Sequence, residues 1–147
     1  MKQILLLTAV VALAAGVAFA DERVSNTPIE MTVHMGTAGA HMYFKPDHLV
    51  FKRNQPYTLV IINDDLQKHE FVSDGLAERI FTTNVETLGP DGKMVAEVKG
   101  QVREIEVNAK DKVEWSFVPV RSGDDMELIC EIQGHEQAGM HGSITIK

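Results

Sequence analysis

The chain has 147 residues, of which 21 are acidic and 14 are basic, so its formal net charge is −7. This length is sufficient for one domain with its own core. The acidic balance argues against nucleic acid or an anionic membrane as a partner, and fits a soluble protein with a protein partner. With a single cysteine, no disulfide can form within the chain.

The first segment, "MKQILLLTAVVALAAGVAFA" (1–20), is typical of a secretory signal peptide. It has a basic start, an apolar run and small residues in an A-x-A cleavage pattern. A membrane anchor is the alternative, but the run is short for a span and no basic stop-transfer flank follows. We expect cleavage before Asp21, export to the periplasm and no later membrane insertion. Loss of Lys2 leaves 13 basic residues (14 minus 1) against 21 acidic ones, a net charge of about −8.

Short apolar runs between turn signals predict an all-β sandwich, formed as one domain over 21–147. The alternation in "VEWSFV" places Val113, Trp115 and Phe117 on one face, with Trp115 in the core, and Pro119 falls at a strand end. The predicted strands include 57–62, 103–107, 113–118, 127–130 and 143–146.

The segment 74–101 is interpreted as an insertion between two sheet-forming halves, with a helix over "GLAERIFTTNVE" (75–86). We expect it to cap one end of the sandwich and to influence the choice of partner. The acidic pairs Asp64–Asp65 and Asp124–Asp125 are interpreted as turn residues rather than as docking acids or calcium ligands.

In an oxidising compartment, a lone cysteine is buried and inert, bridged to another chain, or used in chemistry. Cys130 shares one loop with His135 and Met140. A thiolate, an imidazole and a thioether form a soft donor set, and a thioether is a poor ligand for zinc, magnesium or calcium but a good one for copper. Two histidines, a cysteine and a weak axial methionine make a blue-copper site.

Such a site needs a second histidine, and His69 is the best candidate because it follows an apolar strand. His34 and His41 lie near the mature N-terminus, and His141 directly follows Met140. For the axial position, Glu136, His141 or a backbone oxygen are alternatives to Met140.

The loop "CEIQGHEQAGMHG" (130–142) resembles the ligand loop of the cupredoxins, the small blue copper proteins that include plastocyanin, azurin, auracyanin and rusticyanin. The similarity extends over most of the mature chain. It implies a Greek-key β-sandwich with one mononuclear copper ion bound by His69, Cys130, His135 and Met140. The central segment around "EVKGQVREIEV" resembles a subgroup of exported bacterial cupredoxins and does not specify a physiological role.

One position departs from the family pattern. Plastocyanin and azurin have Asn after the first histidine ligand, where it ties the two ligand loops together, whereas this chain has Glu70. If the Glu70 carboxylate faces the site, it lowers the reduction potential, because negative charge stabilises Cu(II) over Cu(I). If it faces solvent, it has no such effect.

The segment "MTVHMGTAGAHMYFKPDH" (31–48) offers a possible second copper site through His34, Met35, His41, Met42 and His48. Strand alternation is the competing interpretation. In that case the methionines belong to the core and the histidines are solvated.

By resemblance, we expect a periplasmic, monomeric electron carrier with a redox partner such as a cytochrome or a copper enzyme. We expect no enzymatic activity, because no open coordination position and no second histidine-rich cluster are evident. Electrons would pass through His135 beneath an apolar patch formed by Ala138, Gly139 and Met140. The alternatives are a copper-handling protein that contributes to copper tolerance and a structural domain without metal.

Overall fold

The computed structural model of the chain describes residues 26–88, 94–98 and 100–147. The predicted signal peptide, 1–20, lies outside the described residues. Within the described ranges, no helix has the length and apolar character needed to span a bilayer.

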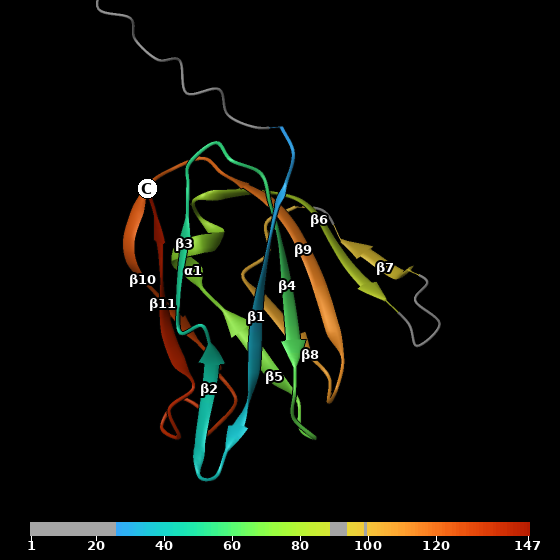
Figure 1. The fold of residues 1–147 in the computed structure, drawn as a ribbon, viewed down its shortest axis with the longest axis vertical. Coiled ribbons are helices and arrows are strands. Elements are labelled where there is room, and N and C mark those ends of the chain that lie inside the picture. The colour runs from blue at the N-terminus through green and yellow to red at the C-terminus, as the bar shows by residue number, and fades with distance from the viewer. Residues whose placement is uncertain (1–25, 89–93, 99) are drawn as a thin grey trace, which may run out of the picture.

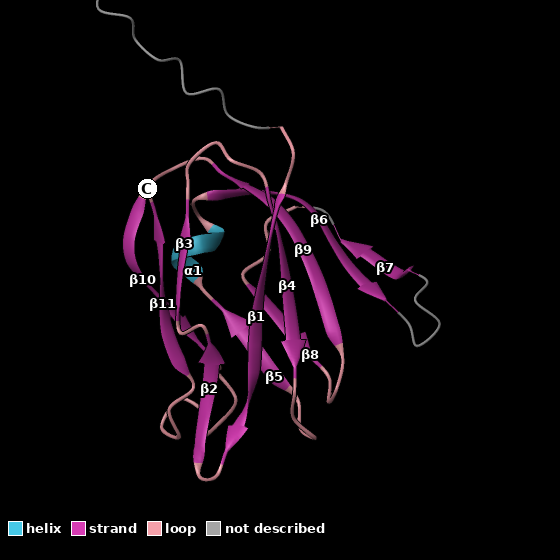
Figure 2. Cartoon of the chain, viewed as in Figure 1, coloured by secondary structure: helices cyan, strands magenta, loops and turns pink. Residues whose placement is uncertain are grey.

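Two β-sheets and one short helix make up the described chain (Figures 1 and 2). The six-stranded sheet has the order β2-β1-β4-β9-β6-β7, and the five-stranded sheet has the order β3-β11-β10-β5-β8. The elements are β1 (Ile29–Ala38), β2 (His41–Lys45), β3 (His48–Phe51), β4 (Tyr57–Asn63), β5 (His69–Val72), α1 (Asp74–Ala77), β6 (Ile80–Leu88), β7 (Met94–Val98), β8 (Glu104–Val107), β9 (Lys112–Pro119), β10 (Gly123–Ile129) and β11 (His141–Ile146).

The sheets are mixed rather than purely antiparallel. β1 runs parallel to β4 and β3 runs parallel to β11, while the other pairs are antiparallel. Chain segments that are far apart in sequence are therefore neighbours, as in a Greek-key arrangement. The predicted all-β sandwich is confirmed.

The core lies between the sheets and is rich in aromatic rings. In β9, Val113, Trp115 and Phe117 are buried, as the alternation predicts, and Pro119 ends the strand. Phe117 lies with its ring centroid 5.1 Å from that of Phe51 and 5.2 Å from that of Trp115. Ring contacts of this kind add to the free energy gained from burial of the apolar surface.

The helix predicted over 75–86 is much shorter than expected. Ser73 caps the first turn by accepting a hydrogen bond from the Leu76 N–H, but α1 ends at Ala77. The residues that follow are β-branched or aromatic in large part, and they pair with β9 as strand β6. With β7 as its partner, β6 extends the six-stranded sheet, so the 74–101 segment is mainly a hairpin.

The aromatic core supplies a test of the fold. Phe117→Ala is expected to lower the free energy of unfolding by about 3–5 kcal/mol, because it removes a buried ring and leaves a cavity. Phe81→Ala is the matched control, since Phe81 lies on the neighbouring strand but is 65% exposed. The control is expected to change stability by less than about 0.5 kcal/mol. Urea unfolding of both variants measures the difference, and equal losses would contradict this description of the core.

Candidate metal centre

Two neighbouring strands supply the residues of the site. His69 is the first residue of β5, and Cys130 directly follows β10. The two strands are hydrogen-bonded neighbours, with Val72 opposite Ile129. The loops that leave β4 and β10 lie at the same end of the sandwich, opposite the C-terminus (Figure 1).

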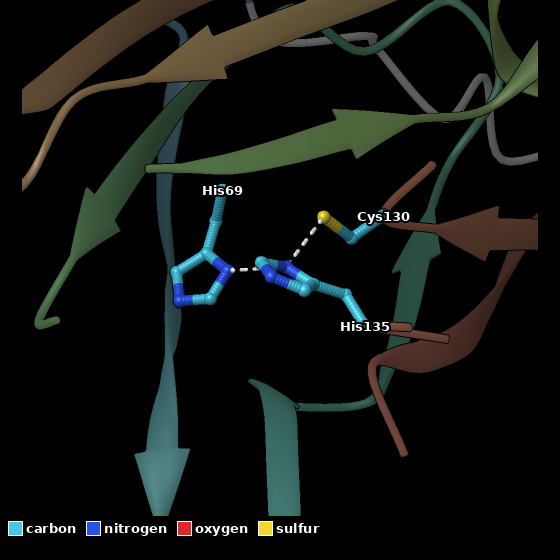
Figure 3. Close-up of side chains that lie close together, drawn as sticks. All are labelled: His69, Cys130 and His135. Atoms are coloured by element: carbon cyan, nitrogen blue, oxygen red, sulfur yellow. Dashed lines mark hydrogen bonds between the residues drawn. The ribbon is translucent and has the colours of Figure 1, made fainter. Parts of the chain in front are cut away.

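His69, Cys130 and His135 converge on one point in the interior. One potential ligand atom from each lies within 4.8 Å of those from the other two. The Nδ1 atoms of His69 and His135 are 3.2 Å apart, and Cys130 Sγ is 3.3 Å from His135 Nδ1 (Figure 3). His69 and Cys130 are 0% exposed and His135 is 8% exposed.

These separations fit a single metal ion. Zinc–sulfur and zinc–nitrogen bonds of roughly 2.0–2.3 Å allow the donor atoms around one ion to lie up to about 4.6 Å apart. The donors are two imidazole nitrogens and a sulfur, which select soft or borderline transition metals over magnesium or calcium. Among the described residues, this is the only group of three or more His, Cys, Asp or Glu side chains arranged closely enough to hold a metal ion.

The loop from 130 to 140 closes on itself, and Met140 ends it. The Met140 N–H donates to the His135 carbonyl at 3.0 Å, and the Cys130 N–H donates to the Met140 carbonyl at 3.3 Å. The Met140 side chain is 0% exposed. Its backbone therefore joins both ends of the loop, while its role as an axial ligand stays a prediction.

Gly139 allows this loop to pack closely against the β1–β2 hairpin. Its φ of +104° is unfavourable for other residues, and a Cβ there would come within 2.1 Å of the His41 ring. The Met42 N–H donates to the Ala138 carbonyl at 2.9 Å. The hairpin thus supports the ligand loop from outside.

Burial shifts the protonation equilibria of two site residues. Burial raises the pKa of the Cys130 thiol, and the N–H groups of Glu70 and Ile132 partly oppose this by donating to the sulfur. Burial also lowers the pKa of His135, and the nearby His69 acts in the same direction. A bound cation would stabilise the thiolate, so metal binding is expected to release a proton.

Glu70 faces away from the donor atoms. Successive residues of a strand point to opposite sides, so the buried His69 directs Glu70 outward, opposite Glu106 of β8. Burial raises the pKa of Glu70, and Glu104 and Glu106 raise it further. Its backbone N–H donates to Cys130 Sγ at 3.3 Å, and its carboxylate accepts a hydrogen bond from the Glu131 backbone. Glu70 therefore ties the two ligand segments together.

The loop between β4 and β5 is held by Asn63, which is 1% exposed. Its Nδ2 contacts the carbonyl oxygens of Gln67, Val107 and Asn108 at 2.8–3.1 Å. Its Oδ1 accepts the Asp65 N–H at 2.9 Å. This residue fixes the path of the chain immediately before His69.

Asp65 contacts His69 with its carboxylate, which lies against the outer nitrogen of the imidazole ring. The distance from Asp65 Oδ2 to His69 Nε2 is 2.9 Å. A hydrogen bond from Thr37 lowers the pKa of Asp65 to about 2, with a smaller contribution from His69 and with burial opposing both.

The structure brings together three of the four ligand residues predicted from the sequence, and it buries the fourth, Met140, on the same loop. It also adds Asn63 and Asp65, which the sequence did not single out as supports. Glu70 was singled out only for its possible effect on the potential, and the structure shows that it joins the two segments. The interpretation of Asp65 as a turn residue describes its backbone but misses its carboxylate. The sequence signal that could have indicated this contact is the separation of four positions between Asp65 and His69.

The histidines of 31–48 do not form a second cluster. His34 Nδ1 lies 2.8 Å from Asp64 Oδ2, and His48 Nδ1 lies 2.8 Å from Ser143 Oγ. Met35 is 0% exposed in the core, as strand alternation predicts. In the described part of the chain, these side chains follow the strand interpretation.

The Asn63 network predicts a large effect of one substitution. Asn63→Ala is expected to lower the free energy of unfolding by about 2–3 kcal/mol, because it leaves buried carbonyl groups and an N–H unpaired. Asn108→Ala is the control, since Asn108 is exposed and its backbone carbonyl takes part instead of its side chain. Chemical unfolding of the metal-free variants measures the difference. A loss for Asn63→Ala no larger than that for the control would exclude this role.

No protein-family model matches the chain, and no curated protein matches its sequence. Solved structures do match its fold. A multicopper oxidase from Pediococcus acidilactici is similar with 16% identity and a TM-score of 0.62, over 100% of this chain and 31% of the oxidase. The multicopper oxidase of the hyperthermophile Aquifex aeolicus is similar with 10% identity and a TM-score of 0.63, over 83% of this chain and 30% of the oxidase.

A copper-containing nitrite reductase from Thermus scotoductus is also similar, with 15% identity and a TM-score of 0.55, over 81% of this chain and 31% of the reductase. The chain thus spans less than a third of the length of each of these proteins. At such identities the likeness shows the fold alone. This chain is a small domain with the cupredoxin-like β-sandwich fold that the sequence resemblance implied.

Proposed function

We propose that the chain binds one copper ion through His69, Cys130, His135 and Met140 and carries single electrons between redox partners. The observation that carries this proposal is the buried convergence of two imidazole Nδ1 atoms and one thiol sulfur. The copper enzymes among the structural relatives support copper as the metal.

The donor set favours copper over its main competitor, zinc. Two histidines and one cysteine suit either ion, but zinc sites use a fourth oxygen, nitrogen or thiolate ligand. The fourth buried residue of this loop is a methionine, whose thioether is the weak axial ligand of blue-copper sites.

The protein surroundings suit electron transfer. Copper bound at this site would supply the exchange of one electron between Cu(II) and Cu(I). The protein would hold the ion in a fixed geometry, because the proposed ligand residues extend from packed strands and a closed loop. His69, Cys130 and Met140 are 0% exposed, so water has little access to the donor atoms.

His135 is the one predicted ligand with an exposed surface, at 8%. Its position suits it to connect the site to a docked partner. Of the expected patch, Ala138 and Gly139 are half-buried and would lie at such a docking face, together with Met42, which is hydrogen-bonded to Ala138. Met140 is fully buried, so it would not contribute to the patch. We propose a redox protein as the partner, a periplasmic location after removal of 1–20, and a monomeric state.

Two alternatives have less support. The first alternative is an enzyme domain, because the two oxidases and the nitrite reductase are enzymes, but the chain spans less than a third of their length. We propose that it has no enzymatic activity of its own. The copper-handling alternative depended on the histidines of 31–48, and two of them are bonded to other side chains.

A copper titration tests the proposal directly. Addition of Cu(II) to the chain without residues 1–20 is expected to produce an intense thiolate-to-copper absorption band that saturates at one equivalent. Cys130→Ser is expected to abolish the band, because the thiolate is its source. His48→Ala is the control, since His48 is exposed, bonds to Ser143 and lies outside the cluster, and it should retain the band.

Other outcomes of this titration have definite meanings. Tight zinc binding with no copper charge-transfer band would overturn copper as the metal. Steady consumption of dioxygen or nitrite by the copper-loaded chain would favour an enzyme. Rapid single-turnover exchange of electrons with a cytochrome, with neither substrate consumed, is the result expected of a carrier.

The axial role of Met140 has its own test. Met140→Leu is expected to raise the reduction potential and change the visible spectrum, because loss of a donor destabilises Cu(II) more than Cu(I). Met35→Leu is the matched control, since Met35 is also fully buried but lies outside the ligand loop. An unchanged spectrum and potential in Met140→Leu would assign the axial position to Glu136, His141 or a backbone oxygen.

A further inference from the structure

His69 makes a polar contact at each of its two ring nitrogens. Nδ1 faces the interior of the site, 3.2 Å from His135 Nδ1. Nε2 points away from the other two cluster residues, as Figure 3 shows, and lies 2.9 Å from Asp65 Oδ2. The ring therefore bridges the metal site and a carboxylate.

The carboxylate is itself held in place. Thr37 Oγ1 in β1 donates to Asp65 Oδ2 at 2.5 Å, and the Leu66 N–H reaches Oδ1 at 3.3 Å. The Asp65 backbone is fixed by its N–H bond to Asn63 and by its carbonyl, which accepts the Lys110 N–H at 3.1 Å. The Asp65 side chain is 22% exposed, so its charge is only partly screened by water.

This geometry selects one form of the imidazole. A neutral imidazole carries a single N–H, and an ionised carboxylate can only accept a hydrogen bond. The proton of His69 therefore belongs on Nε2, facing Asp65, and the lone pair of Nδ1 faces the site. The ring has the tautomer and orientation needed for a metal before any metal binds.

The charge of Asp65 has a further consequence. A carboxylate bonded to the outer nitrogen of a ligand imidazole makes that imidazole a stronger base. A stronger donor and a nearby negative charge both favour the more positive oxidation state of the ion. His135 has no corresponding carboxylate among the hydrogen bonds of the described residues, so the effect belongs to one ligand alone.

We infer that Asp65, held by Thr37, is a positioning residue that fixes the tautomer of His69 and lowers the reduction potential of the bound metal. The part that concerns the potential rests on the proposed copper site. The part that concerns the tautomer does not, because it applies to the metal-free protein.

The first experiment uses metal-free protein. Long-range ¹H–¹⁵N correlation spectra, recorded well above the ordinary histidine pKa of about 6.5, report which ring nitrogen carries the proton. In the wild-type chain, His69 is expected to be protonated at Nε2. In Asp65→Ala it is expected to sample both tautomers. A wild-type His69 protonated at Nδ1, or an Asp65→Ala spectrum identical to that of the wild type, would overturn the tautomer inference.

The second experiment uses copper-loaded protein and the charge-neutral variant Asp65→Asn, which keeps an acceptor oxygen at the same position. The ratio of Cu(II) to Cu(I) affinities is expected to fall at least tenfold, which for one electron raises the potential by about 59 mV. Asp64→Asn is the matched control: it removes the same charge from the neighbouring residue, which pairs with His34 instead. Equal potentials for the two variants would overturn the inference about the charge.

The two experiments separate this inference from the proposed function. If the wild-type chain gave no thiolate-to-copper band, the copper proposal would fail, while the spectra of the metal-free protein would still decide the role of Asp65. If Asp65→Ala did not fold, Asp65→Asn would still report both measurements. In Asp65→Asn, His69 should keep its proton on Nε2 while the potential rises, a combination that a purely structural role does not produce.

Discussion

The site depends on the contact between the start of β5 and the end of β10. Through it, the Glu70 N–H reaches the sulfur of Cys130, and the Glu131 backbone reaches the Glu70 carboxylate. Glu70 and Cys130, 60 positions apart in the sequence, are thereby held together, and this brings His69, the neighbour of Glu70, close to the Cys130 sulfur. The closed loop after Cys130 can then place His135 beside them, because its beginning is already fixed.

Patterns within a short stretch of sequence predicted much of the fold. Alternation identified the inward face of β9, since a strand turns every second residue towards the core. The prediction of a helix over 75–86, in contrast, was wrong for most of its length. There the local pattern fits a helix, but Ile80–Leu88 completes a sheet by pairing with β9, about 30 residues later in the chain. Local propensity does not reveal a partner at that distance.

Cys130, His135 and Met140 could be singled out from the sequence for a different reason. A thiol, an imidazole and a thioether in one loop form an unusual set of donors, and their chemistry indicates a metal without knowledge of the fold. The residues that orient them have no such signature. Asp65 looks like an ordinary turn residue, and Thr37 lies 28 positions before it. Only the parallel pairing of β1 with β4 brings their segments together.

The two imidazoles of the site are supported differently, and this difference suits the electron transfer that we propose for the chain. His69 is fully buried, and a charged carboxylate that is itself held by β1 fixes its outer nitrogen. His135 has a surface exposed to solvent at the end of the sandwich. A carrier must hold its metal in one geometry while bringing one ligand within reach of a partner. If both imidazoles were at the surface, solvent would reach the site; if both were buried and locked, no ligand edge would meet the partner. In the carrier proposed here the two requirements would fall on separate residues, so a substitution at the proposed docking face would be expected to change partner choice without disturbing the support of His69.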